Sequence, residues 1–520
     1  MTSPFLPSRY PWIPDRGDGR YANPILHADY SDPDVIRHGS DYFMVASSFN
    51  CTPGLPILHS RDLVNWSLIN HAIRNVPHPS YAKVRPGCGV WAPSIRFHDG
   101  KFWIFFPMPD EGIYVTTAED PAGDWCQPWC LQEARGWIDP CPFWDEDGNA
   151  YLFHAYANSR SGKKDILHIR PMSPDCRSLL GEGKEIIHTP HHPYLEGPKL
   201  HKFNGWYYIL APGGGVPQGW QVAFRSRNIY GPYEEKIVLE KGSTPINGPH
   251  QGALVDLPSN NEKVPGAEGA WWFLHFQDAG AFGRIVHMQP VRWVDGWPLM
   301  GVDYDGNGVG EPVAAWPKPG IESRVPIASA IPETTDEFDS HAMGLQWQWQ
   351  SNHRPDWTSL TGRPGWLRLQ AQPITEEDFV LTGGLLMQKF PARNFSVETL
   401  LEIGTGRMEI TAGLAVVGGG ESASLSVVRI GEDRECRLQI NNSTIYSAPL
   451  LLQEGSIRLK VEVDERAYSV FSYAHGGGEF IRIEQQFPAK EGGWIGAKVG
   501  IYCQSQDSSA HADFDYFRFS

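Results

Sequence analysis

Three carboxylic acids, Asp32, Asp139 and Glu196, stand at equivalent places in similar stretches of the sequence. Asp32 and Asp139 each precede a proline, and Glu196 begins a Glu-Gly-Pro tripeptide. From each acid the chain runs into a short apolar strand, a polar turn with Gly or Asn, and a second strand rich in aromatic residues. Single tripeptides of this kind carry little information. Their shared position in a repeated unit makes them candidates for chemistry.

Three acids around one pocket would suit the hydrolysis of a glycosidic bond. This reaction uses a protonated carboxyl group that donates to the leaving oxygen and an ionised carboxylate that attacks or activates water. Burial and neighbouring charge separate the two pKa values. We assign Asp32 as the ionised base and Glu196, beside the small residue Gly197, as the proton donor. Asp139 would position the donor and raise its pKa. The alternative is that these acids only cap inner strands or hold a central ion.

The strand–turn–strand unit occurs five times between about residues 23 and 310. Two copies begin without one of the three acids, at Ala92 and near His250. A unit repeated every ~50–60 residues is typical of a β-propeller with one unit per blade. Because equivalent positions of the blades converge on one axis, we expect the three acids to surround a common cavity.

After about residue 336 the sequence changes to short runs of alternating apolar and polar residues, such as SIRLKVEV, separated by Gly and Asp turns. Period-two strands at regular spacing are typical of an antiparallel β-sandwich. We therefore predict an all-β chain with four parts. These are an N-terminal extension (1–22), a five-bladed propeller catalytic domain (23–315), a Pro-rich linker (316–335) and an accessory β-sandwich (336–520).

Composition narrows the classes of partner. The net charge of −16 argues against nucleic acid, whose phosphates require a basic surface. No apolar run of about 20 residues occurs, so we expect no membrane span. The N-terminus lacks the apolar core of a signal peptide, which predicts a cytoplasmic protein. The 8 cysteines are too sparse for a disulfide framework and are expected to be structural or free thiols. The sequence does not decide whether the protein forms a homo-oligomer.

Several blocks of the sequence resemble glycoside hydrolase family 43, in the order found in that family. They are NPILHADYSDPDVIRHGSDYFMVASSF, GVWAPSIRFHDGKFWIFF, WIDPCPFWDEDGNAYLF, LEGPKL and GPHQGALV, within about residues 22–315. The region after about 330 resembles the concanavalin-like, jelly-roll β-sandwich of the β-xylosidase-like members. The resemblance implies a five-bladed propeller and an inverting enzyme acting on β-xylosides or α-L-arabinofuranosides. It places the base, the pKa modulator and the acid on Asp32, Asp139 and Glu196.

The resemblance implies roles for four further residues. Phe49 and Trp91 would wall the subsite of the terminal sugar. Arg284 would reach substrate hydroxyls or lie beside the acids; the alternative is an ordinary surface arginine. His250 would lie on the propeller axis, where family members often place a Ca²⁺ ion with water ligands; the alternative is a buried core histidine. No cofactor is required for the reaction.

The second domain of such enzymes lends a loop that closes the pocket and favours attack on chain ends. The Trp-rich segment 346–360 is the candidate for this loop, with a purely structural role as an equal alternative. We therefore predict an exo-acting inverting hydrolase that releases xylose from the non-reducing ends of β-1,4-xylo-oligosaccharides. The nearest alternative is an α-L-arabinofuranosidase acting on arabinosylated oligosaccharides, or an enzyme with both activities. The alternative from another class is a non-catalytic carbohydrate-binding propeller.

Overall fold

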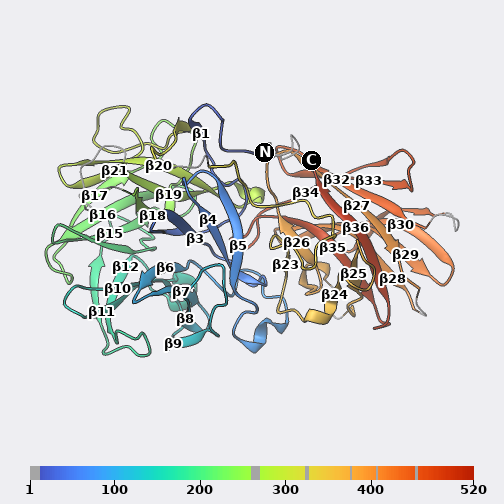
Figure 1. Cartoon of the computed structure of the whole chain (residues 1–520), viewed down its shortest axis with the longest axis horizontal. Helices are drawn as coiled ribbons and strands as arrows, with labels where there is room; N and C mark the ends of the chain where they lie inside the picture. Colours follow the sequence, from blue (N-terminus) through green and yellow to red (C-terminus); the bar gives the residue numbers. More distant parts are fainter. Residues whose placement is uncertain (1–11, 259–269, 322–326, 375–377, 406–407, 451–454) are drawn as a thin grey trace.

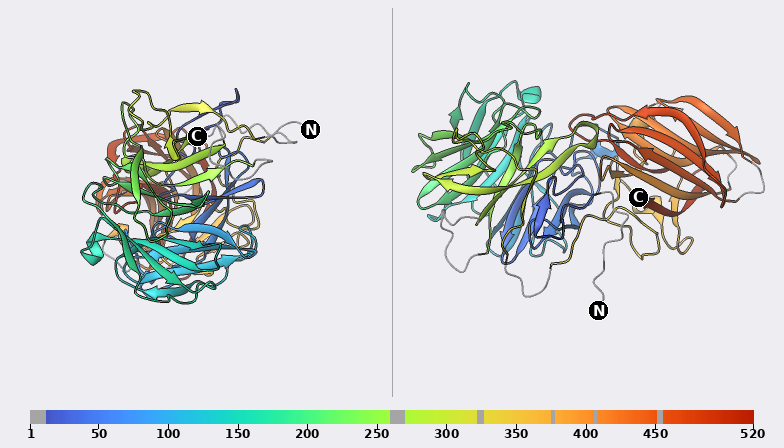
Figure 2. Two further views of the ribbon diagram at one scale, coloured as in Figure 1. Left: turned by 90° about the vertical axis from the view of Figure 1, so that its left-hand side faces the viewer. Right: turned by 90° about the horizontal axis from the view of Figure 1, so that it is seen from above.

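The computed structural model of the chain describes residues 12–258, 270–321, 327–374, 378–405, 408–450 and 455–520. Two all-β domains lie side by side, a blue-to-yellow propeller and an orange-to-red sandwich (Figures 1 and 2). The predicted fold class, a five-bladed propeller followed by a sandwich, is confirmed.

The propeller consists of five four-stranded antiparallel sheets, each built from four consecutive strands. The first two blades are β2 (Asp34–His38), β3 (Asp41–Val45), β4 (Gly54–Ser60) and β5 (Trp66–Ile73), and β6 (Ser94–His98), β7 (Lys101–Met108), β8 (Gly112–Ala118) and β9 (Trp129–Glu133). The third is β10 (Trp137–Trp144), β11 (Ala150–Tyr156), β12 (Ile166–Met172) and β13 (Lys184–His188). The last two are β14 (Lys199–Phe203), β15 (Trp206–Gly213), β16 (Trp220–Ser226) and β17 (Glu234–Leu239), and β18 (His250–Asp256), β19 (Trp271–Asp278), β20 (Arg284–Val294) and β21 (Trp297–Met300).

Tight hairpins fix the register within the blades. Asn204-Gly205 joins β14 to β15, and Asp295-Gly296 joins β20 to β21. All four residues have positive φ, between 51° and 77°. Two-residue loops with both central residues in this region match the right-handed twist of the flanking strands, and Asn-Gly and Asp-Gly are the dipeptides that tolerate it best. The local sequence therefore decides which residues of the blade strands face each other.

The ring closes between the first and fifth blades by side-chain packing, since each blade contains only consecutive strands. Tyr42 and Met44 of β3 belong to the same buried cluster as Leu274 of β19. Arg37 and Asp256 form an ion pair of 2.6 Å across this junction. Packing of apolar side chains, with one partly buried ion pair, therefore closes the propeller.

The end of the predicted N-terminal extension (1–22) pairs with the beginning of the predicted linker. β1 (Arg20–Ala22) pairs antiparallel with β22 (Ala315–Pro317), so the end of the segment forms a ribbon with the chain that leaves the fifth blade. Residues 1–11 of the predicted extension, and 322–326 of the predicted linker, lie outside the described residues.

The C-terminal domain consists of two seven-stranded sheets packed over one apolar core. One sheet contains β23 (Gln348–Trp349), β26 (Leu386–Lys389), β35 (Lys498–Ser505), β28 (Ile410–Gly418), β29 (Glu421–Ile430), β30 (Asp433–Ile440) and β31 (Ser443–Pro449). The other contains β24 (Thr358–Ser359), β25 (Leu367–Gln370), β36 (His511–Phe519), β27 (Phe395–Ile403), β32 (Ile457–Val463), β33 (Tyr468–His475) and β34 (Ile481–Pro488). Strict alternation of buried and half-buried residues along β27 and β32 matches the period-two prediction.

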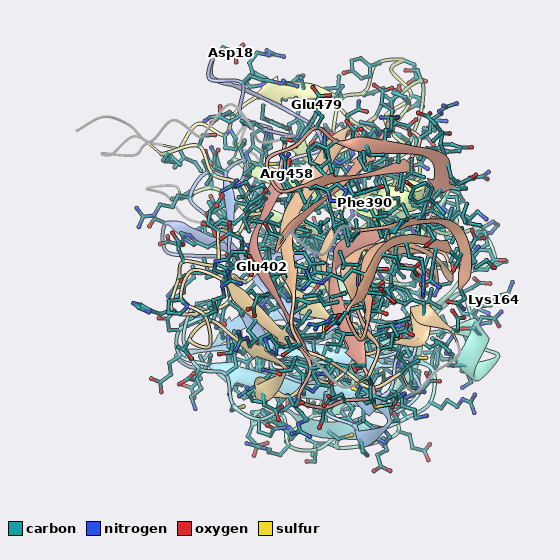
Figure 3. The ribbon with its side chains drawn as sticks, turned by 90° about the vertical axis from the view of Figure 1, so that its right-hand side faces the viewer. Asp18, Lys164, Phe390, Glu402, Arg458 and Glu479 are labelled. Atoms are coloured by element: carbon teal, nitrogen blue, oxygen red, sulfur yellow. The ribbon has the colours of Figure 1, made fainter. Side chains whose placement is uncertain are left out.

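Helices are short in the described residues: α1 (Asn158–Ser161) and the 3₁₀ turns η1 (Pro79–Ala82), η2 (Gly280–Phe282), η3 (Pro355–Trp357) and η4 (Phe379–Leu381). None of those described could cross a membrane, being too short and insufficiently apolar. Seen from the sandwich end, Figure 3 labels Phe390, whose ring centroid lies 6.0 Å from that of Phe282 of the propeller. Figure 3 also labels Glu402 and Arg458, whose charged groups form ion pairs within the sandwich, with Arg363 and Glu398 respectively.

The two domains share further contacts of the backbone. Thr52 of the first blade forms a bridge with Trp349, and the amide of Ala497 donates to the carbonyl of Ala281 at 2.7 Å. The amide of Gly496 donates to Asp29 Oδ2 at 2.9 Å. Each of these bonds joins residues more than 200 positions apart, so the sandwich is held against one definite face of the propeller.

Candidate active site

The three acids named from the sequence line one pocket. The first strand of one blade contacts the first strand of the next at β2–β6, β6–β10 and β18–β2, which places these strands around the axis. Asp32 and Glu196 immediately precede such strands, and Asp139 lies within one. The pocket encloses about 440 Å³ of empty space, including its mouth. It is lined by Asp32, Phe49, Trp91, Ala92, Ile138, Asp139, Glu196, Val216, Gln251, Arg284 and Trp494.

Unusual backbone conformations turn pocket residues toward the axis. Asp32, Phe49, Asp139 and Gln251 all have φ in the left-handed region, at 55°, 52°, 56° and 32°. In the third and fifth blades these residues coincide with shifts in the strand register, between Ile138 and Cys141 and between His250 and Gly252. Such bulges re-aim a side chain, and left-handed non-glycine residues cost of order 1–3 kcal/mol each. Part of the left-handed backbone of the described chain therefore lies at the pocket.

Asp32 lies among groups that stabilise a negative charge. Its Oδ2 accepts hydrogen bonds from the hydroxyls of Ser47 at 2.6 Å and Ser31 at 2.8 Å. Its Oδ1 lies 3.0 Å from the guanidinium of Arg284, and both side chains are buried. Charge-assisted hydrogen bonds to buried carboxylates are strong and fix their orientation. This environment suits an ionised carboxylate.

Asp139 and Glu196 have the opposite environment. Burial raises the pKa of Asp139, and the charge of Glu196 raises it further. A 2.7 Å hydrogen bond from the amide of Gly197 has the opposite effect and lowers this pKa. Burial also raises the pKa of Glu196, and the negative charge of Asp32 adds to this effect while Arg284 opposes it. Because repulsion between two neighbouring carboxylates is mutual, the pair holds a proton at a pH where an exposed acid has lost it.

Gly197 is required for this arrangement. It has φ +60°, and a Cβ at this position would lie 2.7 Å from Cγ of Gln251. A larger residue would therefore strain the backbone at this φ and push against the side chain of Gln251, beside the hydrogen bond from Gly197 to Asp139.

His250 lies directly against Glu196. Its Nε2 is 2.9 Å from Glu196 Oε1, and burial lowers its pKa to about 3, so the imidazole is neutral at ordinary pH. Its Nδ1 is buried without a hydrogen-bond partner in the described part of the chain. A neutral ring with Nε2 as the donor would hold Oε1 of Glu196 and leave Oε2 to carry the proton.

The axial calcium ion implied by the family resemblance finds few ligands here. Calcium takes about 6–8 oxygen ligands. Over the described ranges, no group of three or more His, Cys, Asp or Glu residues is arranged to hold a metal ion. His250 would offer one nitrogen, and the remaining ligands of such an ion would be the water molecules that the resemblance implies.

Aromatic rings form the walls of the pocket. The ring centroids of Phe49 and Trp91 are 6.4 Å apart, and those of Trp91 and Trp494 are 6.5 Å apart. Trp494 belongs to the sandwich and is 52% exposed. The centroid of its ring lies 5.5 Å from the guanidinium carbon of Arg284. The second domain therefore contributes a wall to the pocket of the first.

Residues 346–360, the candidate for this wall, do not supply it and instead have the structural role that was the equal alternative. Residues 346–360 contact the propeller elsewhere, where Gln348 donates to the carbonyl of Pro53 and Asn50 donates to the carbonyl of Gln350. None of them lines the pocket. They attach the sandwich to the first blade, whereas the turn 491–496 reaches the site.

Six of the seven residues predicted for the site line one pocket, and the seventh, His250, lies behind Glu196. Sequence reasoning missed Trp494 and Gln251. The signal for Trp494 is weak: a single tryptophan in the turn sequence Gly-Gly-Trp-Ile-Gly. Gln251 follows His250 at the bulge of β18, and no sequence feature marks that bulge.

Comparison with known proteins agrees with this geometry. Residues 21–298 match the family model of glycosyl hydrolases family 43, and residues 335–520 match the β-xylosidase C-terminal concanavalin A-like domain. A protein of Xylanibacter ruminicola is 46% identical over 376 residues, which is 72% of this chain and 67% of that protein. A β-xylosidase of Formosa agariphila is 31% identical, with 97% of this chain and 91% of that protein covered. A non-reducing end α-L-arabinofuranosidase of Bacteroides ovatus is 27% identical, with 96% and 94% covered.

The crystal structure of a xylan β-1,4-xylosidase from Bacillus halodurans has the same two-domain fold. It superposes with a TM-score of 0.79 at 25% identity, and the match covers 96% of this chain and 99% of that one.

Proposed function

The chain belongs to glycosyl hydrolase family 43, and we propose that it is an exo-acting, inverting β-xylosidase that releases xylose from the non-reducing ends of β-1,4-xylo-oligosaccharides. The observation that carries the proposal is the contrast within one pocket between Asp32, paired with Arg284, and Glu196, whose pKa is raised by burial. One carboxylate and one carboxylic acid are what hydrolysis with inversion requires.

In the proposed mechanism Glu196 is the general acid. Its Oε2 donates a proton to the glycosidic oxygen as the bond to the anomeric carbon breaks. Asp32 accepts a proton from a water molecule, and the resulting hydroxyl bonds to the anomeric carbon on the opposite face of the sugar. Asp139 holds Gly197, the residue after the acid, and its negative form raises the pKa of Glu196. Arg284 keeps Asp32 oriented and ionised.

Attack on chain ends is supported by the shape of the pocket. The pocket is small and is walled by the aromatic rings of Phe49, Trp91 and Trp494. Trp494 stands beside Trp91 and Arg284, where it narrows the opening from the side of the sandwich. A pocket walled in this way suits one terminal sugar ring better than the middle of a chain.

The second candidate is an α-L-arabinofuranosidase, or an enzyme with both activities. It is favoured by the relative from Bacteroides ovatus, which carries that name and matches nearly the whole chain. The two sugars present similar hydroxyl positions, so the same acids could serve both. Arabinosylated oligosaccharides would then be substrates beside xylo-oligosaccharides.

Aryl β-xyloside and aryl α-L-arabinofuranoside assayed side by side test the proposal. We expect the larger kcat/KM on the xyloside, and xylose released from xylo-oligosaccharides one unit at a time. A larger kcat/KM on the arabinofuranoside would replace the proposal by the second candidate. Binding of both sugars without turnover of either would leave only a carbohydrate-binding propeller.

A further inference from the structure

A lysine amine and a thiol meet between the two domains, away from the pocket lining. Cys51 follows Phe49 by two positions in the loop between β3 and β4, and Lys498 is the first residue of β35. The Nζ of Lys498 lies 2.6 Å from the Sγ of Cys51. Both residues are buried, with 5% and 1% of their surfaces exposed. No role in the proposed hydrolysis uses this pair.

The distance is too short for an ordinary hydrogen bond to sulfur. Other nitrogen–sulfur hydrogen bonds in this structure are longer. Those to Cys141 measure 3.1 and 3.4 Å, that to Cys126 measures 3.3 Å, and that to Cys88 measures 3.9 Å. Even N–H···O bonds, whose acceptor is smaller, centre near about 2.9 Å. A separation of 2.6 Å is instead what one oxygen atom, singly bonded to both nitrogen and sulfur, would give.

The surroundings of the pair favour reaction of the thiol with an oxidant. Lys389 of β26 stands directly opposite Lys498 in the strand register, so a second, partly buried lysine lies next to the pair. Burial lowers the pKa of Lys389, and the charge of Lys498 lowers it further while Asp29 opposes this effect. A neighbouring lysine or other cationic group favours the thiolate, which is the reactive form of a cysteine.

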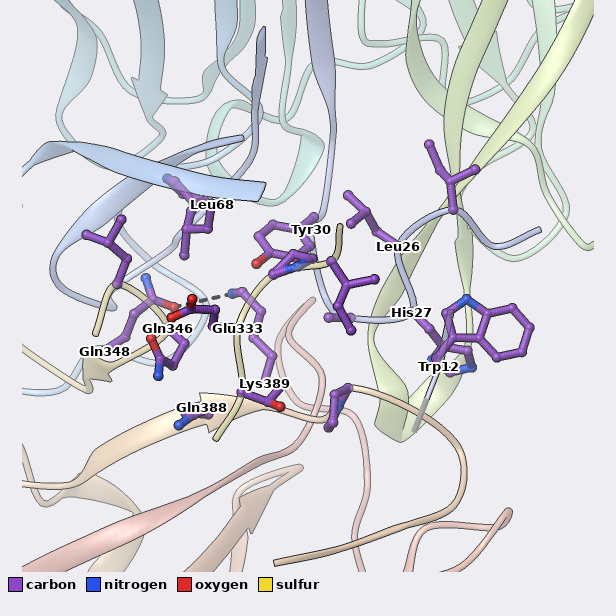
Figure 4. A pocket seen from close by; sticks show the side chains of 18 of the residues that line it. Trp12, Leu26, His27, Tyr30, Leu68, Glu333, Gln346, Gln348, Gln388 and Lys389 are labelled. Atoms are coloured by element: carbon purple, nitrogen blue, oxygen red, sulfur yellow. Dashed lines mark hydrogen bonds between the residues drawn. The ribbon is translucent and has the colours of Figure 1, made fainter. Parts of the chain in front are cut away.

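A cavity reaches one member of this cluster, Lys389. It lies between the domains and is drawn in Figure 4, where the amine of Lys389 points into it and contacts Gln348 at 3.3 Å. Tyr30 and His71 form part of its lining, and it holds about 680 Å³ of empty space, including its mouth. Dioxygen or peroxide in this cavity would reach Lys389, the strand partner of Lys498.

We propose that Cys51 and Lys498 form a covalent S–O–N bridge under oxidising conditions. The thiol, the amine and one dioxygen molecule give the bridge and one water. Sulfur and nitrogen each lose two electrons, dioxygen takes up all four, one oxygen atom becomes the bridge, and the other leaves as water with the two displaced hydrogens. Four equivalents of a small thiol reverse the reaction, and the products are the free cysteine, the free lysine, one water and two disulfides of the reductant.

The bridge would connect two walls of the active-site pocket. Cys51 is two residues beyond Phe49, and Lys498 is four residues beyond Trp494. The two ends are 447 positions apart in sequence, so the bridge would close a loop that spans both domains. Cross-links that close long loops stabilise folded proteins most in the chain-entropy model. The oxidised enzyme would therefore hold its sandwich domain more firmly than the reduced enzyme.

Mass spectrometry of the full chain tests the proposal. The wild-type enzyme is split, one half is treated with hydrogen peroxide and the other with excess small thiol. We expect the oxidised half to be heavier by one oxygen less two hydrogens, about 14 Da. Its digest should contain a linked peptide joining Cys51 to Lys498, with no tryptic cleavage after Lys498. Re-reduction should remove both signals.

Three variants locate the reaction. Cys51→Ser and Lys498→Gln should show neither the mass gain nor the linked peptide, while Cys503→Ala, which removes a buried cysteine of the same strand β35, should show both. The melting temperature of the wild type and of Cys503→Ala should rise by several degrees on oxidation, and that of Cys51→Ser should not.

Four outcomes would overturn the proposal. A gain of about 16 or 32 Da confined to the Cys51 peptide would show an unlinked sulfenic or sulfinic acid. A loss of about 2 Da with a linked peptide would show a direct S–N bond. An unmodified Cys51 after peroxide would show an inert buried contact. A linked peptide that persists in Lys498→Gln would place the partner of Cys51 elsewhere.

Discussion

At the level of single residues, chemically similar groups of the pocket have different surroundings. Asp32 accepts from two hydroxyls and faces Arg284, which stabilises its ionised form. Glu196 is desolvated and faces His250, whose pKa is lowered to about 3. A neutral imidazole cannot stabilise the glutamate anion as a cation would, so it orients the acid without removing its proton. The base and the acid are therefore distinguished by their neighbours.

Glu196→Gln should lower kcat on xylobiose by about 10²–10⁴-fold, because the leaving oxygen loses its proton donor. A dinitrophenyl xyloside, whose leaving group needs no proton, should lose far less activity. The control Glu146→Gln changes an exposed acid of the neighbouring blade and should leave both rates unchanged. Equal losses on the two substrates would show that Glu196 does not act as the acid.

Asp139→Asn should move the alkaline limb of the pH profile of kcat/KM to lower pH. The pKa of Glu196 is raised in the folded enzyme, so the acid is protonated below that pKa and activity falls as the pH rises through it. Removing the second carboxyl group of the coupled pair removes their mutual repulsion, and the proton is lost earlier. Asp145→Asn, in the same blade, serves as the control. An alkaline limb that stays in place in Asp139→Asn would remove the modulator role.

At the scale of elements, β-bulges and a sandwich turn shape the pocket. The bulges of β10 and β18 coincide with the left-handed residues Asp139 and Gln251. The turn before β35 supplies Trp494. The propeller thus fixes the acids through its strand entrances, and the sandwich adds an aromatic wall through one turn.

Trp494→Ala should raise KM for xylo-oligosaccharides by about tenfold, or ~1.4 kcal/mol of binding, with a smaller effect on kcat. Tyr304→Ala removes an exposed aromatic ring that does not line the pocket and should change neither constant. If KM stays at the wild-type value in Trp494→Ala, the turn does not contribute to sugar binding.

The propeller and the acids were predictable because they depend on local patterns. Each blade repeats one strand–turn–strand unit with recognisable turn dipeptides, and Asp32, Asp139 and Glu196 occupy equivalent places in that unit. The position of Trp494 depends on how the sandwich docks onto the propeller, through bonds such as that between Gly496 and Asp29. No periodicity in the sequence encodes such a contact. The prediction for the closing loop therefore fell on segment 346–360, which is rich in tryptophan.

At the scale of the whole molecule, the active site is shared between the domains. Asp29 links them next to the pocket: its Oδ1 accepts from the amide of Arg284 at 3.0 Å, and its Oδ2 accepts from the amide of Gly496 at 2.9 Å. One buried carboxylate therefore holds the backbone of the residue that orients the base and the turn that carries Trp494. We therefore expect domain docking and substrate binding to be coupled through this residue.

Asp29→Ala should lower the melting temperature by several degrees and raise KM. It leaves two buried amides without an acceptor, at about 1–3 kcal/mol each. Asp29→Asn keeps one acceptor oxygen and should recover part of both losses. A variant Asp29→Ala that melts lower but binds substrate like the wild type would show that docking and binding are independent.

The stereochemistry of the first product tests the assignment of Asp32 and Glu196 most directly. Proton NMR of a β-linked xyloside, recorded within the first turnovers and before the released sugar equilibrates, distinguishes the two anomers of xylose. A single displacement by water activated at Asp32, opposite a leaving group protonated by Glu196, must give α-xylose first. β-Xylose as the first product would mean that a carboxylate attacks the sugar itself, and it would contradict the roles assigned to both residues.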